Sequence, residues 1–318
     1  MQACSRDGSE SGLIGTTIRT IDLAGDKSQI KDREERNARQ LEITKTQMRA
    51  FAWMYRELEE KGKLDKLKIM IPMVESAEHM AKMQALMDEQ AKKALEDRIA
   101  SLTAQLNPTA TMVKPPEGAE RIAIETEIAN LERDIETGNI PKIKLGCMYE
   151  IPALSGDLAT IETSFISVGS NDLIHALLDI DRYSRESIKK YDPTNRTVLH
   201  DLKRVVDVGR DRGIPVSICG DMASESKYTA LLIGLGYRNL SADPNSVPIV
   251  KEISSRVDVA EAEALFETLY DPKWTRAQRE EILADFNEKR LGLDKNGKVD
   301  LDWDGPTEEW TPPAPGVS

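Results

Sequence analysis

The stretch of sequence that decides the fold is Phe165-Ile166-Ser167-Val168-Gly169-Ser170-Asn171-Asp172-Leu173, with Asp181-Arg182 shortly after it. Residues 165–168 have strand character and run into Gly-Ser, and an amide and a carboxylate follow. In parallel α/β proteins, ligands bind at the loops that follow the strands, because several strand ends converge there. We therefore predict a strand that ends in a functional loop; the alternative is a strand followed by an Asn-Asp helix cap.

The polar residues of this loop suit a metal ion and an anionic ligand. Asp172 is of the type that holds a hard divalent cation. Asn171 could donate to an anion, and Arg182 could bind a phosphate or a carboxylate through two hydrogen bonds. Two other expected strands also end in reactive side chains, because Glu150 follows one of them and Cys219 closes another. For the cysteine, the alternative is an inert residue of the core.

Near the N-terminus, residues 17–22 alternate as a strand does and lead into a short loop of charged and small residues, 23–27. Arg19, Asp22 and Lys27 are therefore candidates for contacts with an anion or a metal ion. The alternative is a solvated strand end whose charges pair with one another.

Composition limits the function. The 318 residues carry 43 basic and 55 acidic side chains, a net charge of −12, which argues against nucleic acid or an anionic membrane as a partner. No apolar run of about 18 residues and no apolar signal-peptide core is present, so we expect a cytoplasmic protein. The three cysteines, Cys4, Cys147 and Cys219, are too widely spaced for a disulfide framework or a zinc site.

The order of patterns along the chain predicts an α/β barrel domain over residues 16–255. A polar, Gly/Ser-rich leader (1–15) should be mobile, residues 256–293 should be helical, and the acidic, Pro-rich tail (294–318) should be flexible. Apolar runs and flanking helical patterns indicate six parallel strands. The six expected strands are 17–22, 67–74, 142–150, 165–168, 214–221 and 239–242.

Residues 75–140 interrupt the barrel pattern with two helical pieces joined by a Pro-rich break. Both pieces show a narrow apolar seam of the coiled-coil type, which predicts a helical hairpin with solvated charged flanks. The seam residues are Leu95, Ile99, Leu102 and Leu106 in the first piece, and Ile124, Ile128, Leu131 and Ile135 in the second.

Taken together, IRTIDLAGDK, KIMIPMV, GCMYEIP, ISVGSNDL, the pair Asp181-Arg182 and ICGDMA are six segments that occur in a familiar order, and ADPNSV follows them. The chain resembles the phosphoenolpyruvate-binding (β/α)8 barrel domain of the PEP-utilising enzymes over about residues 16–255, apart from the hairpin. The resemblance implies a TIM-type barrel. Only six of its eight strands can be assigned, since nothing before Thr16 matches the first two, so we expect an incomplete barrel that associates with itself or with another chain.

The resemblance also implies a role for each candidate residue. Glu150 and Asp172 would hold a magnesium ion that bridges the carboxylate and the phosphate of phosphoenolpyruvate. Arg19, Asn171, Asp172 and Arg182 would bind the substrate. Cys219 would exchange a proton at the methylene carbon of the pyruvate enolate.

Several departures from the family leave two functions open. No stretch of the sequence matches the Gly-rich Ser-His signature of the family's phosphohistidine domain, two substrate arginines lack clear counterparts, and His175 stands where the family commonly has Gln. The first hypothesis is a magnesium-dependent phosphotransferase domain that acts on phosphoenolpyruvate with a phosphohistidine domain supplied by a separate chain. The second is a module without turnover that senses phosphoenolpyruvate or docks a partner.

Overall fold

The computed structural model describes residues 16–19, 33–64, 67–108, 114–181, 187–294, 297–306, 310, 311 and 313, with the backbone alone at 16–19, 33–37, 187 and 188. Of the candidate site residues, Arg182, Asp22 and Lys27 lie outside the described residues, and only the backbone of Arg19 is described. The expected leader also lies outside them, as do residues 295, 296, 307–309, 312 and 314–318 of the expected tail.

A single parallel sheet forms the centre of the described chain, with its strands in sequence order from β1 to β6. The strands are β1 (Thr16–Arg19), β2 (Leu67–Ile71), β3 (Gly146–Tyr149), β4 (Ile166–Gly169), β5 (Val216–Cys219) and β6 (Leu240–Ser241). Within the described residues, β1 pairs only with β2 and β6 only with β5. The sheet is thus an open half-barrel, which confirms the α/β class and the incomplete TIM-type barrel.

The expected sixth strand needs a correction, because β6 has only two residues. The described part of the sheet therefore has five strands of at least four residues and a two-residue remnant of the sixth. Two local features stop the pairing: Asp243 donates its backbone N–H to Ser224 Oγ at 2.9 Å, and Pro244 has no N–H to offer.

The two faces of the sheet are covered differently. Every residue of β3 and β4 is buried, as expected of parallel strands with packing on both sides. On one face, residues such as Tyr149 and Val168 join the main core beneath the helices. On the other, inner face, Met70, Met148 and Phe165 form a small separate cluster with Cys219 against it.

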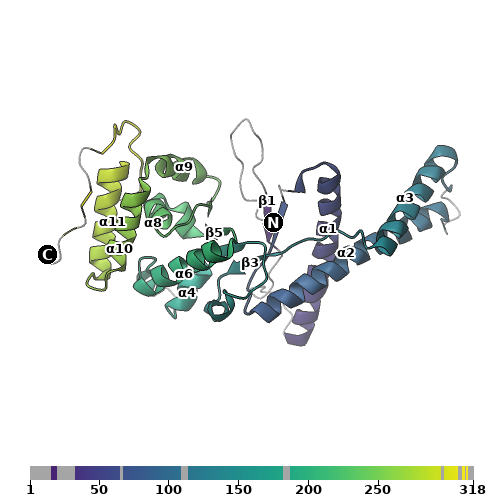
Figure 1. Ribbon diagram of the computed structural model, residues 1–318, viewed down its shortest axis with the longest axis horizontal. Helices are drawn as coiled ribbons and strands as arrows, with labels where there is room; N and C mark the ends of the chain where they lie inside the picture. The colour runs from purple at the N-terminus through teal and green to yellow at the C-terminus, as the bar shows by residue number, and fades with distance from the viewer. Residues whose placement is uncertain are drawn as a thin grey trace.

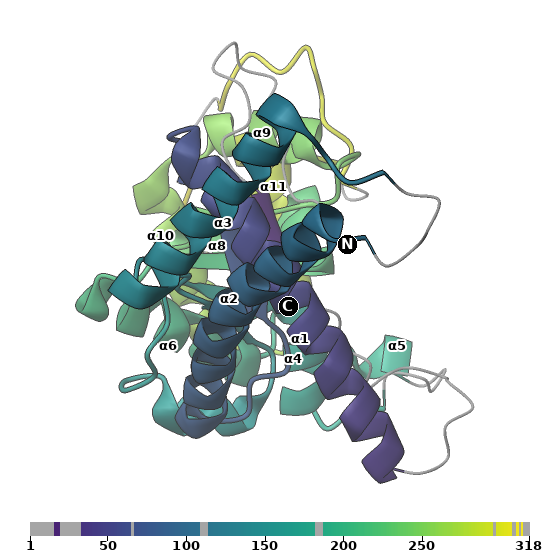
Figure 2. The ribbon, with the colours of Figure 1, turned by 90° about the vertical axis from the view of Figure 1, so that its right-hand side faces the viewer.

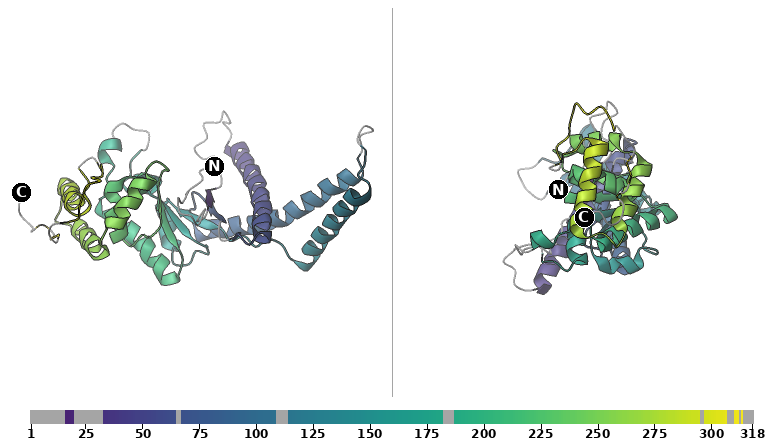
Figure 3. Two further views of the ribbon diagram at one scale, coloured as in Figure 1. Left: turned by 90° about the horizontal axis from the view of Figure 1, so that it is seen from above. Right: turned by 90° about the vertical axis from the view of Figure 1, so that its left-hand side faces the viewer.

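Helices flank the sheet and extend the molecule in two directions (Figure 1, Figure 3). The long helices at the hairpin end are α1 (Arg33–Glu60), α2 (Ala77–Leu106) and α3 (Gly118–Thr137). Short helices follow the strands: α4 (Ser170–Leu177), α5 (Ser187–Lys190), α7 (Asp221–Ser224), α8 (Thr229–Gly234) and the 3-10 turns η2 (Pro152–Asp157) and η3 (Ser226–Tyr228). The remaining helices are α6 (Arg196–Arg212), α9 (Val247–Arg256), α10 (Val259–Tyr270) and α11 (Arg276–Leu291).

Helices α2 and α3 form the hairpin, which projects from the sheet on the side opposite to α10 and α11 (Figure 1). Its seam is a cluster of its own, formed by Leu95, Leu102 and Leu131 with the predicted isoleucines around them. The first half of α2 belongs instead to the main core, since Met80, Met87, Ala91 and Ala94 are buried there. The hairpin is therefore anchored by α2 at its base, and Figure 2 shows α1 beside that base. No described helix is long and apolar enough to cross a membrane.

Candidate functional site

The candidate residues gather where three neighbouring strands end. Glu150 directly follows β3, Asn171 and Asp172 lie in the first turn of α4 directly after β4, and Cys219 is the last residue of β5. The three strands pair in register, with Tyr149 opposite Val168 and Gly169 opposite Cys219. Arg19 closes β1 at the same end of the sheet, opposite Met70. The structure thus brings most of the predicted residues to one edge.

Glu150 is held between the ends of its two neighbouring strands. Its side chain is almost fully buried, at 2% exposure, and Oε1 accepts a hydrogen bond from the backbone N–H of Met73 at 2.8 Å. Met73 has a left-handed backbone with φ of 52°, which is uncommon outside glycine and costs conformational energy. On the other side, a Cβ atom at Gly169 would meet Glu150 Oε2 at 2.7 Å. The carboxylate of Glu150 is therefore fixed in position from both sides.

The strand that ends at Glu150 is also fixed from behind. The Tyr149 hydroxyl donates to Asp201 Oδ2 of α6 at 2.7 Å in a buried contact. Burial raises the pKa of Asp201, while the hydrogen bond from Tyr149 opposes that change. Burial also raises the pKa of Tyr149, so its hydroxyl keeps the proton that it donates. This contact ties α6 to the end of β3.

The turn between β4 and α4 is locked to the turn after β5. Ser170 Oγ donates to the carbonyl oxygen of Cys219 at 2.7 Å, and Asp221 donates its N–H to Asn171 Oδ1 at 2.9 Å. Gly220 permits this approach, since it has φ of 98° and a Cβ there would lie 2.5 Å from Ser170 Oγ. The amide oxygen of Asn171 is thus used within the protein. Its amide nitrogen has no partner among the described residues and remains able to donate to an anion.

The two described cysteines differ in their surroundings. Cys219 is half-buried on the inner face of the sheet, and its Sγ lies 3.4 Å from the carbonyl oxygen of Val168. Cys147 is fully buried in the main core, and burial, followed by the charge of Glu150, raises its pKa to about 12. Cys147 is therefore a core residue, whereas Cys219 lies at the end of β5 near the other candidate residues.

The donor set at this edge fits a magnesium ion. Magnesium in proteins is commonly bound by one or two carboxylates, with its remaining places filled by water and substrate oxygens. Glu150 and Asp172 follow neighbouring strands and supply two carboxylates of this kind, and a Cβ at Gly169 would intrude on the first of them. Among the described residues, no group of three or more His, Cys, Asp and Glu side chains converges as a closed protein cage would require.

Sequence reasoning missed several residues of this edge. Met73, Gly169 and Gly220 shape the site through the backbone, and only the Gly-Ser and Gly-Asp pairs that follow the strands could have indicated the two glycines. His175 is turned back onto the same loop, where its Nδ1 lies 2.6 Å from the Asn171 carbonyl oxygen. Its ring also contacts that of Tyr191, with centroids 5.1 Å apart.

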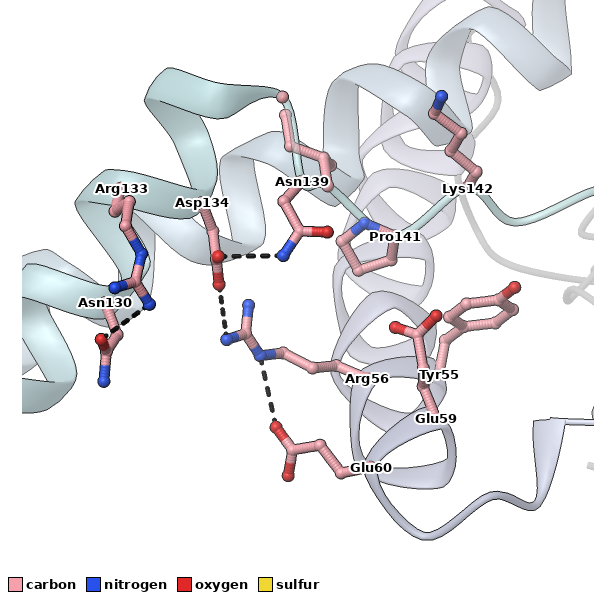
Figure 4. A pocket seen from close by; sticks show the side chains of 12 residues that line it. Tyr55, Arg56, Glu59, Glu60, Asn130, Arg133, Asp134, Asn139, Pro141 and Lys142 are labelled. Atoms are coloured by element: carbon pink, nitrogen blue, oxygen red, sulfur yellow. Dashed lines mark hydrogen bonds and ion pairs between the residues drawn. The ribbon is translucent and has the colours of Figure 1, made fainter.

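A polar pocket lies away from the strand ends, between α1 and the segment that follows α3 (Figure 4). Arg56 binds Asp134 at 2.7 Å across it, and Asn139 donates to the same carboxylate at 2.9 Å. The amide of Asn139 and then Arg56 hold the pKa of Asp134 below its ordinary value, although burial opposes them. These contacts fasten the hairpin to α1, and none of the predicted site residues lines the pocket.

Comparison with known proteins identifies relatives of the part of the chain that carries this edge. A family model described as PEP-utilising enzyme, PEP-binding domain, matches residues 112–259. An Escherichia coli protein named phosphoenolpyruvate-dependent phosphotransferase system is 31% identical over 198 residues, which cover 61% of this chain and 26% of that protein. A phosphoenolpyruvate-protein phosphotransferase of Borreliella burgdorferi is 33% identical over 148 residues, or 45% of this chain and 26% of the relative.

A longer alignment joins the chain to a phosphoenolpyruvate-protein phosphotransferase of Latilactobacillus sakei, with 28% identity over 282 residues, 86% of this chain and 42% of the relative. The chain therefore spans between 26% and 42% of the length of these three relatives. The matches confirm the resemblance that the six sequence segments indicated.

Proposed function

Because residues 112–259 match the model of the PEP-binding domain of the PEP-utilising enzymes, we propose that this chain binds phosphoenolpyruvate with magnesium and takes part in transfer of its phosphoryl group. The observation that carries the proposal is the convergence of Glu150, Asn171, Asp172 and Cys219 at the ends of β3, β4 and β5. Ligands of parallel barrels bind at this end of the strands.

In this proposal Glu150 and Asp172 hold the magnesium ion, which when bound neutralises phosphate charge and orients the substrate. The contact with Met73 fixes Glu150 before the ligand arrives, so little reorganisation is needed on binding. The amide nitrogen of Asn171, which has no partner among the described residues, donates to a substrate oxygen. Arg19 and Arg182 are proposed to pair with the carboxylate and the phosphate.

The role proposed for Cys219 is proton transfer at carbon. When the bond between phosphorus and the enol oxygen breaks, the remaining pyruvate is an enolate whose methylene carbon needs a proton. The thiol of Cys219 gives its proton to that carbon, a C–H bond forms, and the resulting thiolate regains a proton from water. A half-buried thiol on the inner face of the sheet suits this task.

The phosphoryl group requires an acceptor, and we propose a histidine on a phosphohistidine domain supplied by a separate chain. A second candidate function is a module without turnover, which senses phosphoenolpyruvate or docks a partner. The hairpin favours this alternative, because it projects from the sheet on the side opposite to the C-terminal helices (Figure 1).

Calorimetric titration with phosphoenolpyruvate, with and without magnesium, tests the binding site. Asp172→Asn keeps the size of the side chain but removes its charge, so it should abolish the magnesium-dependent binding. The control is Glu162→Gln, which removes an exposed charge from a residue of the loop before β4 and should bind like the wild type. Equal binding by wild type and Asp172→Asn would mean that the site lies elsewhere.

Proton exchange separates the enzyme from the module without turnover. With pyruvate and magnesium in deuterated water, the wild type should exchange the methyl protons, and Cys219→Ala should stop the exchange. Cys147→Ala is the control, since its thiol lies in the main core. Binding of phosphoenolpyruvate without any exchange by the wild type would favour the second candidate function.

A further inference from the structure

Tyr191 lies beside the candidate site, although it belongs to a different segment, between α5 and α6. Its ring contacts that of His175 at 5.1 Å between centroids. His175 in turn lies one helical turn after Asn171 and hydrogen-bonds to the carbonyl oxygen of that residue at 2.6 Å. Tyr191 is therefore separated from the loop that carries Asn171 and Asp172 by one side chain.

The hydroxyl of Tyr191 is buried and has no hydrogen-bond partner among the described residues. Buried hydroxyls are nearly always paired in native proteins, so an unpaired one next to a site calls for a ligand or a functional explanation. The surroundings keep this group protonated. Burial, followed by the charge of Asp221 and smaller contributions that include Asp172, raises the pKa of Tyr191. The hydroxyl is thus a neutral donor, and Asp172 and Asp221, whose charges act on it, follow the ends of β4 and β5.

Helix α11 holds the backbone of Tyr191 in this place. Arg276 donates from Nη2 to the carbonyl oxygen of Tyr191 at 2.9 Å and from Nη1 to that of Lys189 at 2.6 Å. Three residues further along the helix, Arg279 binds the buried carboxylate of Asp192 at 3.1 Å. These three contacts come from the first turn of a helix that begins with a capping box at Thr275. The segment is thus fixed from outside the half-barrel, and the position of Tyr191 is set before any ligand binds.

We propose that Tyr191 is a further binding residue of the site and that its hydroxyl donates a hydrogen bond to an anionic oxygen of bound phosphoenolpyruvate. The proposal rests on the proposed function. A carboxylate or phosphate oxygen supplies the acceptor that the buried hydroxyl lacks within the described protein. Arg276 acts as a positioning residue, because it holds the backbone of Tyr191 and not the ligand.

Tyr191→Phe tests the proposal, since it removes one oxygen atom and keeps the ring against His175. In calorimetric titration with phosphoenolpyruvate and magnesium, this variant should bind about ten- to a hundredfold more weakly, as expected for loss of a hydrogen bond to a charged group. Its melting temperature without ligand should stay equal to that of the wild type or rise, because the lost hydroxyl has no partner in the described part of the chain.

Tyr237→Phe is the matched control. Its hydroxyl is buried and donates to the carbonyl oxygen of Leu202 at 3.0 Å, within the core. Removing it should lower the melting temperature by about 2 °C and leave the affinity for phosphoenolpyruvate unchanged. The two variants thus distinguish a hydroxyl that binds the ligand from a hydroxyl that stabilises the folded protein.

The possible outcomes are distinct. If the wild type binds and Tyr191→Phe binds equally well, the role of Tyr191 is wrong and the proposed function stands. If Tyr191→Phe instead lowers the melting temperature as Tyr237→Phe does, its hydroxyl has a partner in the protein and the proposal is also wrong. If the wild type does not bind phosphoenolpyruvate with magnesium at all, the proposed function fails, and the inference about Tyr191 fails with it.

Discussion

The backbone N–H of Met73 donates a hydrogen bond to Glu150 Oε1 across 2.8 Å, and this contact joins the loop after β2 to the end of β3. Met73 keeps a left-handed backbone to make it. Strained residues of this kind persist only where the surrounding structure holds them, and they cluster at functional sites. Glu150 is thus positioned from both sides, because the backbone of Gly169 lies close to its other oxygen, Oε2.

Gly169→Ala should displace Glu150. The new Cβ atom would meet Oε2 at 2.7 Å and the Cβ of Glu150 at 3.0 Å, so the carboxylate must move. We expect a loss of about 1–3 kcal/mol in the free energy of unfolding and a loss of magnesium-dependent phosphoenolpyruvate binding. Gly156→Ala is the control, because a Cβ there would meet nothing within 4 Å. Unchanged binding by Gly169→Ala, measured by calorimetry, would show that Glu150 is not a ligand.

The thiols should react at very different rates. In a Cys4→Ser background, an alkylating reagent at pH 8 should modify Cys219 readily and Cys147 only after unfolding, because a pKa of about 12 leaves roughly one Cys147 in ten thousand as thiolate. Peptide mass spectrometry measures both. Fast modification of native Cys147 would contradict its burial.

The same burial makes the stability depend on pH. Because the pKa of Cys147 lies above the ordinary 9.0, its contribution to the free energy of unfolding is fully present below pH 9 and decreases as the pH rises toward 12.

Arg279→Met should destabilise the C-terminal part of the molecule. Arg279 and Asp192 are 10% and 6% exposed, and removal of the cation leaves a buried carboxylate without its counter-charge. We expect the free energy of unfolding in urea to fall by about 3 kcal/mol. Lys289→Met on the same helix removes an exposed partner of Asp285 and should cost less than about 0.5 kcal/mol. Equal effects of the two substitutions would refute the buried pair.

A shortened hairpin should leave the rest of the protein folded. Arg98 and Glu127 face each other at 2.9 Å, so a short Gly/Ser loop between them can replace residues 99–126. The base keeps the contact between Leu95 and Leu131 and the pair of Arg56 with Asp134. We expect a cooperative thermal transition with less helical signal in the far-UV.

A wider deletion of residues 90–139 serves as the contrast. It removes Ala91 and Ala94 from the main core, together with the 2.7 Å hydrogen bond from Arg49 to Gln90. This variant should unfold without cooperativity or fail to accumulate. If the shorter deletion behaves in the same way, the outer hairpin contributes to the core.

The open sheet should promote association. In the described part of the chain, β1 and β6 are the end strands of the sheet, and end strands of an open sheet favour pairing with another chain. We expect self-association, or binding to a polypeptide that supplies further strands, as closure of a parallel barrel requires. Sedimentation at micromolar concentration measures the state. A monodisperse monomer would show that the edges are covered within the chain.

Local sequence patterns predicted much of the fold. Apolar runs such as 67–71 and 165–168 identified parallel strands, and the seam of leucines and isoleucines identified the hairpin, because burial periodicity is a property of neighbouring residues. The position of Glu150, Asp172 and Cys219 relative to their strands followed from the same reading. The length of the sixth strand was overestimated. The contact of Asp243 with Ser224 that ends this strand joins residues 19 positions apart, so no local pattern reveals it.

Contacts between distant segments came only from the assembled molecule. No local pattern places the Met73 amide on Glu150, 77 residues away, or the Asp221 amide on Asn171, 50 residues away. The backbone of Tyr191 is likewise held by an arginine 85 residues further along the chain, Arg276. Chain order thus established which chemical groups stand at the ends of the strands. Their orientation depends on strand register and helix docking, because these bring together atoms whose separation in sequence carries no periodic signal.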